Sequence, residues 1–425
     1  MCAEPARRPG EARSPFSALV RRLTGGVLAM LVVLAGCSTA RSNTGLPGSS
    51  STTSGMPAPV TSRDLQAPGC SSAIAPARVM SSLRTFSLAT PPSPFGVAAE
   101  SSGHFAFVAT SGGVEVLFAN GPNLRFVRLV PLSDGRGLGA ALTRDDQYLL
   151  VGAGNGAAVL SVPALVTGAG QAVLGYLAAG EGAIEVSVSA DDEFAFLSLE
   201  YKGGIAVFNL EQAIRSHFHD VKEVSFIRLG QAVVGSALSP DGRFLYVTSE
   251  VGAPAGFDVS GEGSLSVISV ARAVHDQSDA IVTSVKAGCQ PVRVVVSDDG
   301  AVVWATARGS DAVLAWIVAD LTGGDASRAL TADVLVGAAP VGIVAAADGD
   351  LVVADSNRFS AAPGPRYLSI IDEGLALAGK PALLGQVVTA MFPRDMCLEA
   401  GGLTVLVTDF RSSQVQSLDL GGLSG

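Results

Sequence analysis

An all-β fold built from seven repeats is predicted by three features of this 425-residue sequence. One sequence pattern recurs along most of the chain, and its copies carry turn residues between short apolar segments. Glycine is also abundant, with 50 residues. Asp-Gly between two apolar stretches is the strongest short-range signal for a β-hairpin, because glycine takes the positive φ of a type I′ turn. Repeats of this length with several short strands are typical of β-propellers. The sequence therefore predicts a seven-bladed β-propeller of four-stranded antiparallel blades over residues 83–425.

The first 36 residues are predicted to be a lipoprotein signal peptide. Arg21 and Arg22 precede the apolar run LTGGVLAMLVVLAG, which suits a signal peptide and is too short for a transmembrane helix. The run ends in Leu34-Ala35-Gly36-Cys37, which resembles the lipobox of bacterial lipoproteins. The resemblance implies cleavage before Cys37 and lipidation of its sulfur, and hence a protein anchored to the cell membrane on its extracytoplasmic side. The alternative is an ordinary cleaved signal peptide followed by a chance cysteine.

Residues 37–82 are expected to form a flexible tether behind the lipidated Cys37. This stretch is rich in Ser, Thr, Gly, Pro and Ala, and it shows neither the period of a strand nor that of a helix. Its predicted role is to hold the folded domain away from the membrane.

The repeats themselves favour a closed ring. The seven copies begin at Pro94, Gly137, Ile184, Val233, Pro291, Pro340 and Pro393. Their second strands, such as FAFVA and FLYVT, are apolar on both faces, as expected of strands buried between neighbouring blades. The last copy lacks a fourth strand, whereas the segment LRTFSLAT at residues 83–90 precedes the first copy without a partner. We expect this N-terminal strand to complete the last blade and to bury both sheet edges.

Several of the repeat copies resemble, in their sequence, a known group of proteins. SPDGRFLYVTS, at residues 239–249, is similar to the repeats of YVTN-type seven-bladed propellers, which are related to bacterial lactonase-like propellers. The segments that begin at Cys289 and Phe392 resemble one extracytoplasmic branch of that group. The resemblance implies a fold and not an activity, because propellers serve as hydrolases, isomerases and binding platforms.

One position of the first strand, which lines the central channel, carries a charge in only two copies. Alignment on the turns places seven residues there: Gly96, Gly139, Val186, Gly235, Arg293, Gly342 and Asp395. Glycine suits a crowded axis, so Arg293 and Asp395 are exceptional. We expect them to present a site at the channel mouth together with Arg394. The alternative is an internal salt bridge that connects two blades. The two interpretations are compatible, because charged side chains buried at a low-dielectric axis need a partner of opposite charge.

The loops after the second strands add candidates on the same face, which we call the top face. The last three copies contribute Arg308, Asn357, Arg358, Asp409 and Arg411, and earlier copies contribute Glu200, Tyr201, Lys202 and Glu250. The planar guanidinium of arginine suits carboxylates and other anions. Five arginines in one sector of an acidic protein therefore predict a ligand-binding site, although each residue alone could be an ordinary solvated loop charge.

The net charge and the positions of the histidines argue against some classes of partner and of activity. The net charge is −10 and no basic run follows Arg22, which argues against nucleic acid as a partner. We expect a monomeric binding platform for an envelope protein or a small anionic ligand, without metal or cofactor. A lactonase-like hydrolase or isomerase, with Arg293 and Arg394 stabilising negative charge, is the alternative. All 4 histidines map away from the top face, which disfavours acid–base catalysis there. A purely structural platform is the third possibility.

Three cysteines follow Cys37 in the sequence, namely Cys70, Cys289 and Cys397. An extracytoplasmic location permits disulfides, and three thiols allow one bridge and one free cysteine. We expect Cys397 to be a buried small hydrophobic residue, and a Cys70–Cys289 bridge to pin the tether to the domain.

Overall fold

The computed structural model describes residues 65–70, 74–133, 135–257, 262–347, 349–359 and 366–423. The predicted signal peptide, Cys37 and most of the tether lie outside these residues. Residues 62–425 form one compact unit. Within the described ranges, no helix has the length and apolar character needed to cross a membrane.

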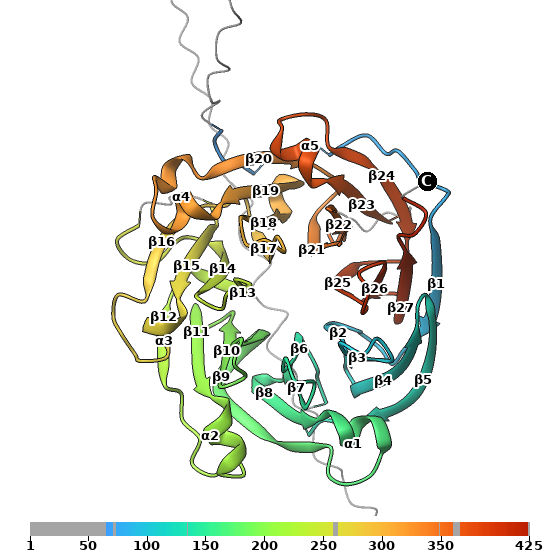
Figure 1. Cartoon of the computed structure of the whole chain (residues 1–425), viewed down its shortest axis with the longest axis vertical. Helices are drawn as coiled ribbons and strands as arrows, with labels where there is room; N and C mark the ends of the chain where they lie inside the picture. Colours follow the sequence, from blue (N-terminus) through green and yellow to red (C-terminus); the bar gives the residue numbers. More distant parts are fainter. Residues whose placement is uncertain are drawn as a thin grey trace, which may run out of the picture. The chain divides into compact units, whose positions relative to one another are not determined.

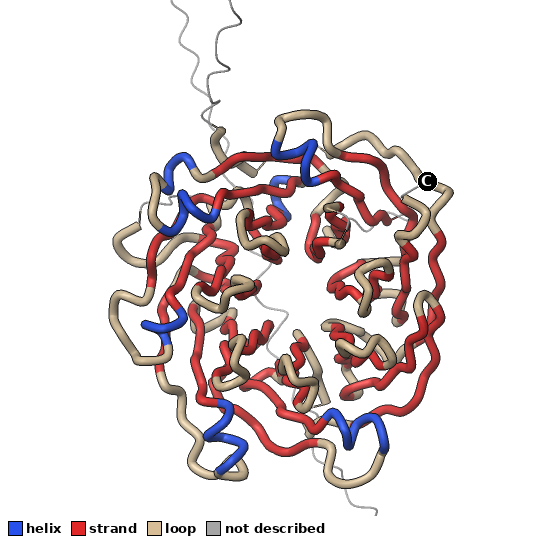
Figure 2. The backbone as a smooth tube through the Cα atoms, viewed as in Figure 1, coloured by secondary structure: helices blue, strands red, loops and turns tan. Residues whose placement is uncertain are grey.

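The described chain is an all-β structure whose antiparallel sheets are arranged around a common central axis in a propeller-like manner (Figures 1 and 2). One four-stranded sheet contains β2 (Val97–Ala99), β3 (Phe105–Thr110), β4 (Gly113–Asn120) and β5 (Asn123–Val130). Another contains β13 (Gln231–Leu238), β14 (Phe244–Val251), β15 (Ser264–Ser269) and β16 (Ile281–Lys286). The next contains β17 (Pro291–Val296), β18 (Val302–Ala307), β19 (Ala312–Ile317) and β20 (Leu330–Leu335). It is followed by β21 (Pro340–Ala345), β22 (Asp350–Asp355), β23 (Arg366–Asp372) and β24 (Leu383–Thr389).

A seven-stranded sheet holds the second and third repeats. Its strands are β6 (Ala140–Leu142), β7 (Tyr148–Gly152), β8 (Gly154–Ser161), β9 (Val173–Val188), β10 (Phe194–Leu199), β11 (Gly204–Asn209) and β12 (Ser225–Arg228). The long strand β9 pairs with β8 through its first part and with β10 through its second part. Gly180 and Gly182, with φ of 94° and 85°, lie between the two parts, where side chains would be strained. Strand β9 is therefore the outer strand of one repeat and the inner strand of the next.

The N-terminal strand joins the last sheet. β1 (Arg84–Ala89) pairs antiparallel with β27 (Gln414–Asp419), from Arg84 opposite Asp419 to Ala89 opposite Gln414. The sheet continues through β26 (Thr404–Asp409) to β25 (Pro393–Leu398). Segments from the two ends of the described chain thus share one sheet, and β1 covers the edge that β27 would otherwise expose.

The core lies between neighbouring sheets and not within any one of them. All residues of β18 are buried, and Trp304 from this strand packs with Val313 and with Leu351 of the next sheet. Short helices follow the third strands of the repeats: α1 (Val162–Thr167), α2 (Leu210–Arg215), α3 (Val270–Ala273), α4 (Val318–Thr322) and α5 (Glu373–Leu377). Asn209 and Asp372 cap the backbone N–H groups of α2 and α5 with their side chains.

The expectation of a flexible tether up to residue 82 is wrong for the segments 65–70 and 74–82. The Met80 N–H donates to the Gln386 carbonyl at 2.8 Å, and the Gln386 N–H donates to the Arg78 carbonyl at 2.8 Å, so this segment adds to the outer edge of β24. Ala67 packs against a second apolar cluster. An unpaired sheet edge can form hydrogen bonds with the backbone of a neighbouring segment, and the amino-acid composition of that segment does not indicate such pairing.

Candidate functional site

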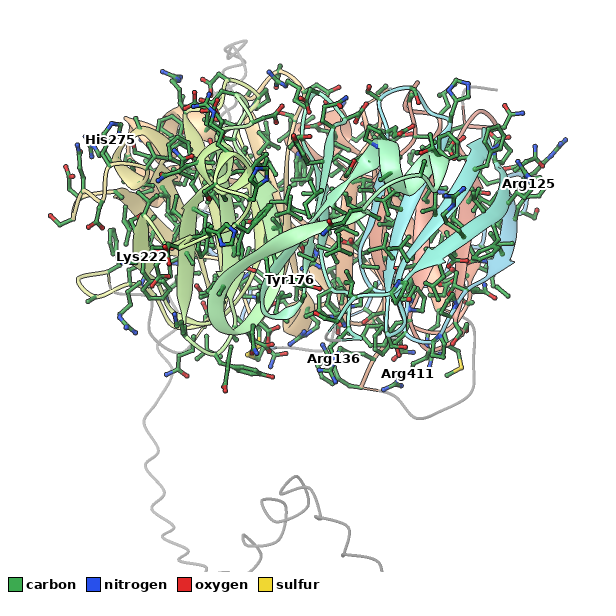
Figure 3. The ribbon with its side chains drawn as sticks, turned by 90° about the horizontal axis from the view of Figure 1, so that it is seen from below. Arg125, Arg136, Tyr176, Lys222, His275 and Arg411 are labelled. Atoms are coloured by element: carbon green, nitrogen blue, oxygen red, sulfur yellow. A yellow bond between two sulfur atoms is a disulfide. The ribbon has the colours of Figure 1, made fainter. Side chains whose placement is uncertain are left out.

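A cavity of about 750 Å³ lies where the loops after the second strands and the entries to the first strands converge. Every repeat contributes to its lining, as expected for the top end of the central axis. In Figure 3, Arg136 and Arg411 of this lining lie at one end of the domain, away from Arg125 and His275. We call this space the top cavity.

The top cavity brings together most of the residues that the sequence singles out. Five predicted arginines line it, namely Arg293, Arg308, Arg358, Arg394 and Arg411. Glu200, Tyr201 and Glu250 line it as well, whereas Lys202 turns away and donates to the Ala179 carbonyl. Among the described residues, none of the lining side chains is a histidine, and no group of three or more His, Cys, Asp or Glu residues could hold a metal ion.

Arg293 forms the floor of the cavity through a buried ion cluster. Its guanidinium lies 2.7 Å from Glu185 and 3.3 Å from Asp395, and it donates to the Val234 carbonyl at 3.1 Å. Arg293 is 7% exposed, and both carboxylate residues are buried as well. The cluster thus joins three sheets at the axis. It includes the Arg293–Asp395 salt bridge, which was the alternative interpretation of the sequence.

Glu185 is the member of this cluster that the sequence alignment missed. Ser198, Thr248, Thr306 and Thr408 each accept, through the side-chain oxygen, the backbone N–H of the residue 13 positions earlier: Glu185, Gly235, Arg293 and Asp395. Glu185, and not Val186, therefore stands at the repeated position. The alignment on the turns displaced this copy by one residue. The 13-residue spacing to a hydroxyl side chain was the signal that could have found it.

One guanidinium cannot neutralise two buried carboxylates. Burial and the neighbouring Asp395 raise the pKa of Glu185 to about 7, although Arg293 opposes them. Burial lowers the pKa of Arg293, but Glu185 and Asp395 outweigh it and hold that pKa above the ordinary value. The cluster therefore keeps Arg293 charged and favours a proton on Glu185.

The arginines nearer the mouth differ in their pairing. Arg308, 5% exposed, lies 2.6 Å from the Glu250 carboxylate. Arg358, Arg394 and Arg411 form no ion pair with any described residue. Instead they lie against aromatic rings, and the closest contact places the Arg394 guanidinium carbon 3.7 Å from the centroid of Phe95.

Arg394 is the most unusual of these groups. Burial and the nearby charges of Arg293 and Arg358 lower its pKa to about 9. Its Nε is buried and has no hydrogen-bond partner among the described residues. A buried donor without an acceptor is costly, so an anion in the cavity would relieve both the repulsion and the missing hydrogen bond.

Three predicted site residues lie elsewhere. Asp395 lines a separate pocket of about 320 Å³ whose walls come from the inner strands. Asp409 is fully buried at the end of β26, where it accepts hydrogen bonds from Thr389 and Gln414, both at 3.1 Å. Asn357 occupies a turn with φ of 44° and does not line the cavity. The direction of each of these side chains depends on local packing, which the repeat pattern does not specify.

Buried carboxyls give the protein a pH dependence that can be measured. Burial raises the pKa of Asp355 to about 8, and its Oδ2 accepts a hydrogen bond from Ser369 at 2.7 Å. A raised pKa means that the folded state binds more protons than the unfolded state, so stability falls as pH rises from about 4 to about 8. We expect a lower Tm at pH 8.5 than at pH 5.5, and a smaller difference in Asp355→Asn. Equal pH dependence of the two proteins would contradict this assignment.

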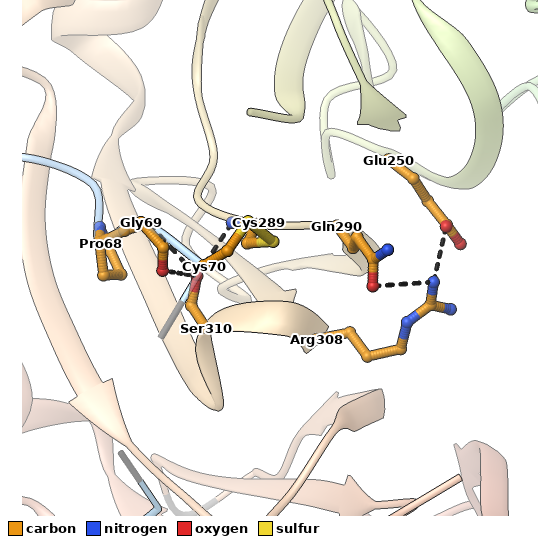
Figure 4. The surroundings of a disulfide bond; sticks show 8 residues. All are labelled: Pro68, Gly69, Cys70, Glu250, Cys289, Gln290, Arg308 and Ser310. Carbon is orange, nitrogen blue, oxygen red and sulfur yellow. Dashed lines mark hydrogen bonds and ion pairs between the residues drawn. A yellow bond between two sulfur atoms is a disulfide. The ribbon is translucent and has the colours of Figure 1, made fainter. Parts of the chain in front are cut away.

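The disulfide between Cys70 and Cys289 lies near Arg308 and Glu250, two residues of the cavity lining (Figure 4). Its sulfur atoms are 2.03 Å apart and its Cα atoms 4.9 Å apart. Ser310 Oγ accepts the Cys289 N–H at 2.9 Å and lies 3.2 Å from the Pro68 carbonyl, so it holds both sides of the bridge. Gln290, the next residue, lies 3.4 Å from Arg308. Cys397 is a free thiol, and burial raises its pKa.

Comparison with known proteins adds information about the fold alone. Neither a protein-family model nor a curated protein matches the chain. A solved structure of Kuenenia stuttgartiensis hydrazine synthase is similar, with a TM-score of 0.57 and 14% sequence identity. The match covers 78% of this chain and 96% of that chain. At this identity the similarity supports the all-β, propeller-like fold and carries no argument about activity.

Proposed function

We propose that this protein is a lipid-anchored, extracytoplasmic binding protein whose top cavity holds a small anionic ligand. In this proposal the domain is a seven-bladed propeller of the YVTN type. Division of β9 at Gly180–Gly182 gives seven four-stranded units, the last completed by β1, which supports that count. The lipobox-like segment at residues 34–37 supports the anchor.

One observation carries the binding proposal: four guanidiniums that form no ion pair with a described residue converge on one cavity, those of Arg136, Arg358, Arg394 and Arg411. Arg358, Arg394 and Arg411 line it together with the aromatic residues Phe392 and Phe410. A volume of about 750 Å³ is within the range of small-molecule sites, which combine apolar walls with a few placed polar groups.

The proposal is tested by calorimetric titration with succinate, glutarate, 3-phenylpropionate and inorganic phosphate. We expect at least one of these anions to bind, and we expect Arg358→Gln/Arg394→Gln to weaken that binding by about tenfold or more, since each charge-assisted hydrogen bond contributes roughly 1.5–3 kcal/mol. The variant Arg125→Gln/Arg128→Gln makes the same charge change on the outer strand β5 and should bind like the wild type.

A variant that leaves the buried residues intact keeps the test independent of folding. Arg411 is exposed, so Arg411→Gln should fold normally and still weaken anion binding. Equal affinities of the wild type, the Arg411 variant and the double variant would contradict the proposal, as would the absence of binding by all four anions.

A further inference from the structure

The top cavity has two chemically different halves. Most of its arginines come from the last three sheets, either from the first strands β17 and β25 or from the loops after β18, β22 and β26, whereas Arg136 precedes β6 of the seven-stranded sheet. Its carboxylates, Glu181, Glu200 and Glu250, come from the seven-stranded sheet and from β14. These groups of sheets occupy different arcs of the ring (Figure 1). A ligand in the cavity therefore meets mainly cations on one side, and on the other side three carboxylates together with Arg136.

Glu200 is the half-buried carboxylate on this acidic side that has no hydrogen-bond or ion-pair partner among the described residues, whereas Glu181, which has none either, is exposed. Glu250 is neutralised by Arg308 at 2.6 Å, whereas no hydrogen-bond donor among the described residues reaches the carboxylate of Glu200. Burial raises the pKa of Glu200, and repulsion from Glu250 raises it further, even though Arg394, Arg358 and Arg308 are close enough to oppose both effects. A cationic group of a ligand would supply the hydrogen-bond donor that the described residues do not provide for the Glu200 carboxylate.

We infer that the ligand is an amino acid or a closely related zwitterion, whose carboxylate contacts Arg358 and Arg394 and whose ammonium group contacts Glu200. This inference rests on the proposed function and adds the class of ligand to it. An ammonium group offers three donors and a positive charge, which suits a carboxylate that repels its neighbour. Phe95, Phe392 and Phe410 leave apolar surface for the remainder of such a ligand.

The test compares molecules that differ only in the amino group. Three pairs are titrated at pH 7.5: aspartate with succinate, glutamate with glutarate, and phenylalanine with 3-phenylpropionate. We expect at least one amino acid to bind about tenfold or more tightly than its counterpart, since a charge-assisted hydrogen bond to Glu200 is made only with the amine. Glu200→Gln should abolish this preference while it leaves the affinity for the counterpart nearly unchanged. Glu223→Gln, on an exposed residue outside the cavity, should keep the preference.

The outcomes separate this inference from the function on which it rests. If every amino-free molecule that binds does so as tightly as its amino partner, the anion site stands and the zwitterion inference fails. A preference that survives in Glu200→Gln also overturns the inference. If no member of any pair binds, both the inference and the proposed small-ligand function are contradicted.

Discussion

Replacement of Arg293 by methionine is expected to destabilise the protein by about 3–5 kcal/mol, because removal of one partner from a buried ion cluster leaves uncompensated charge. Here the uncompensated groups are Glu185 and Asp395, at 2.7 and 3.3 Å from the guanidinium. The lost hydrogen bond to the Val234 carbonyl adds to the effect. Methionine fills a similar volume, so the expected loss reflects electrostatics more than a cavity.

The measurement is the shift in Tm by scanning calorimetry, together with a rescue variant. Glu185→Gln/Arg293→Met/Asp395→Asn removes all three charges at the axis and should recover most of the lost stability. Arg125→Met, on the outer strand β5, serves as the control for the loss of an arginine. If Arg293→Met unfolds at the wild-type temperature, the ion cluster does not hold the sheets together at the axis.

Loss of the disulfide is expected to destabilise the protein by about 3–5 kcal/mol, because a cross-link that closes a long loop restricts the unfolded chain strongly. Cys70 and Cys289 are 219 residues apart in the sequence. The double variant Cys70→Ser/Cys289→Ser should therefore unfold at a lower denaturant concentration than the oxidised wild type. The segment 65–70 should also become more accessible to proteases, since Ser310 and the bridge hold it in place.

Reductant provides the matching control for this prediction. The reduced wild type should unfold at the same denaturant concentration as the double variant, and reductant should have no further effect on that variant. Cys397→Ala keeps the bridge and should retain the full response to reductant. A wild type whose unfolding is insensitive to reductant would contradict a stabilising role for the bridge.

Repeat geometry explains why much of the site could be predicted from the sequence. The loops after the second strands emerge at one end of every repeat, so the alignment alone placed Arg308, Arg358 and Arg411 around one opening. Arg293 was recognised because its neighbours at the repeated position are mostly glycine. The strands were predictable for a similar reason, since each apolar pair is joined by a turn that requires Gly or Asp.

The remainder depends on contacts that a repeat alignment cannot supply. Glu185 was missed because the third copy was aligned one residue too late, an offset that the hydrogen bond from its backbone N–H to Ser198 reveals. The attachment of residues 74–82 to β24 uses backbone hydrogen bonds, which leave no pattern in the side chains. Asp409 was assigned to the top face, but its carboxylate is buried and accepts hydrogen bonds from Thr389 and Gln414.

The most direct test is a crystal structure of the protein with the tightest-binding molecule of the six carboxylates titrated. We predict that the ligand lies in the top cavity with its carboxylate within hydrogen-bond distance of Arg394 Nε, a buried donor that has no hydrogen-bond partner among the described residues. A ligand bound elsewhere on the domain, with Arg358 and Arg394 unchanged and still without an acceptor, would contradict it.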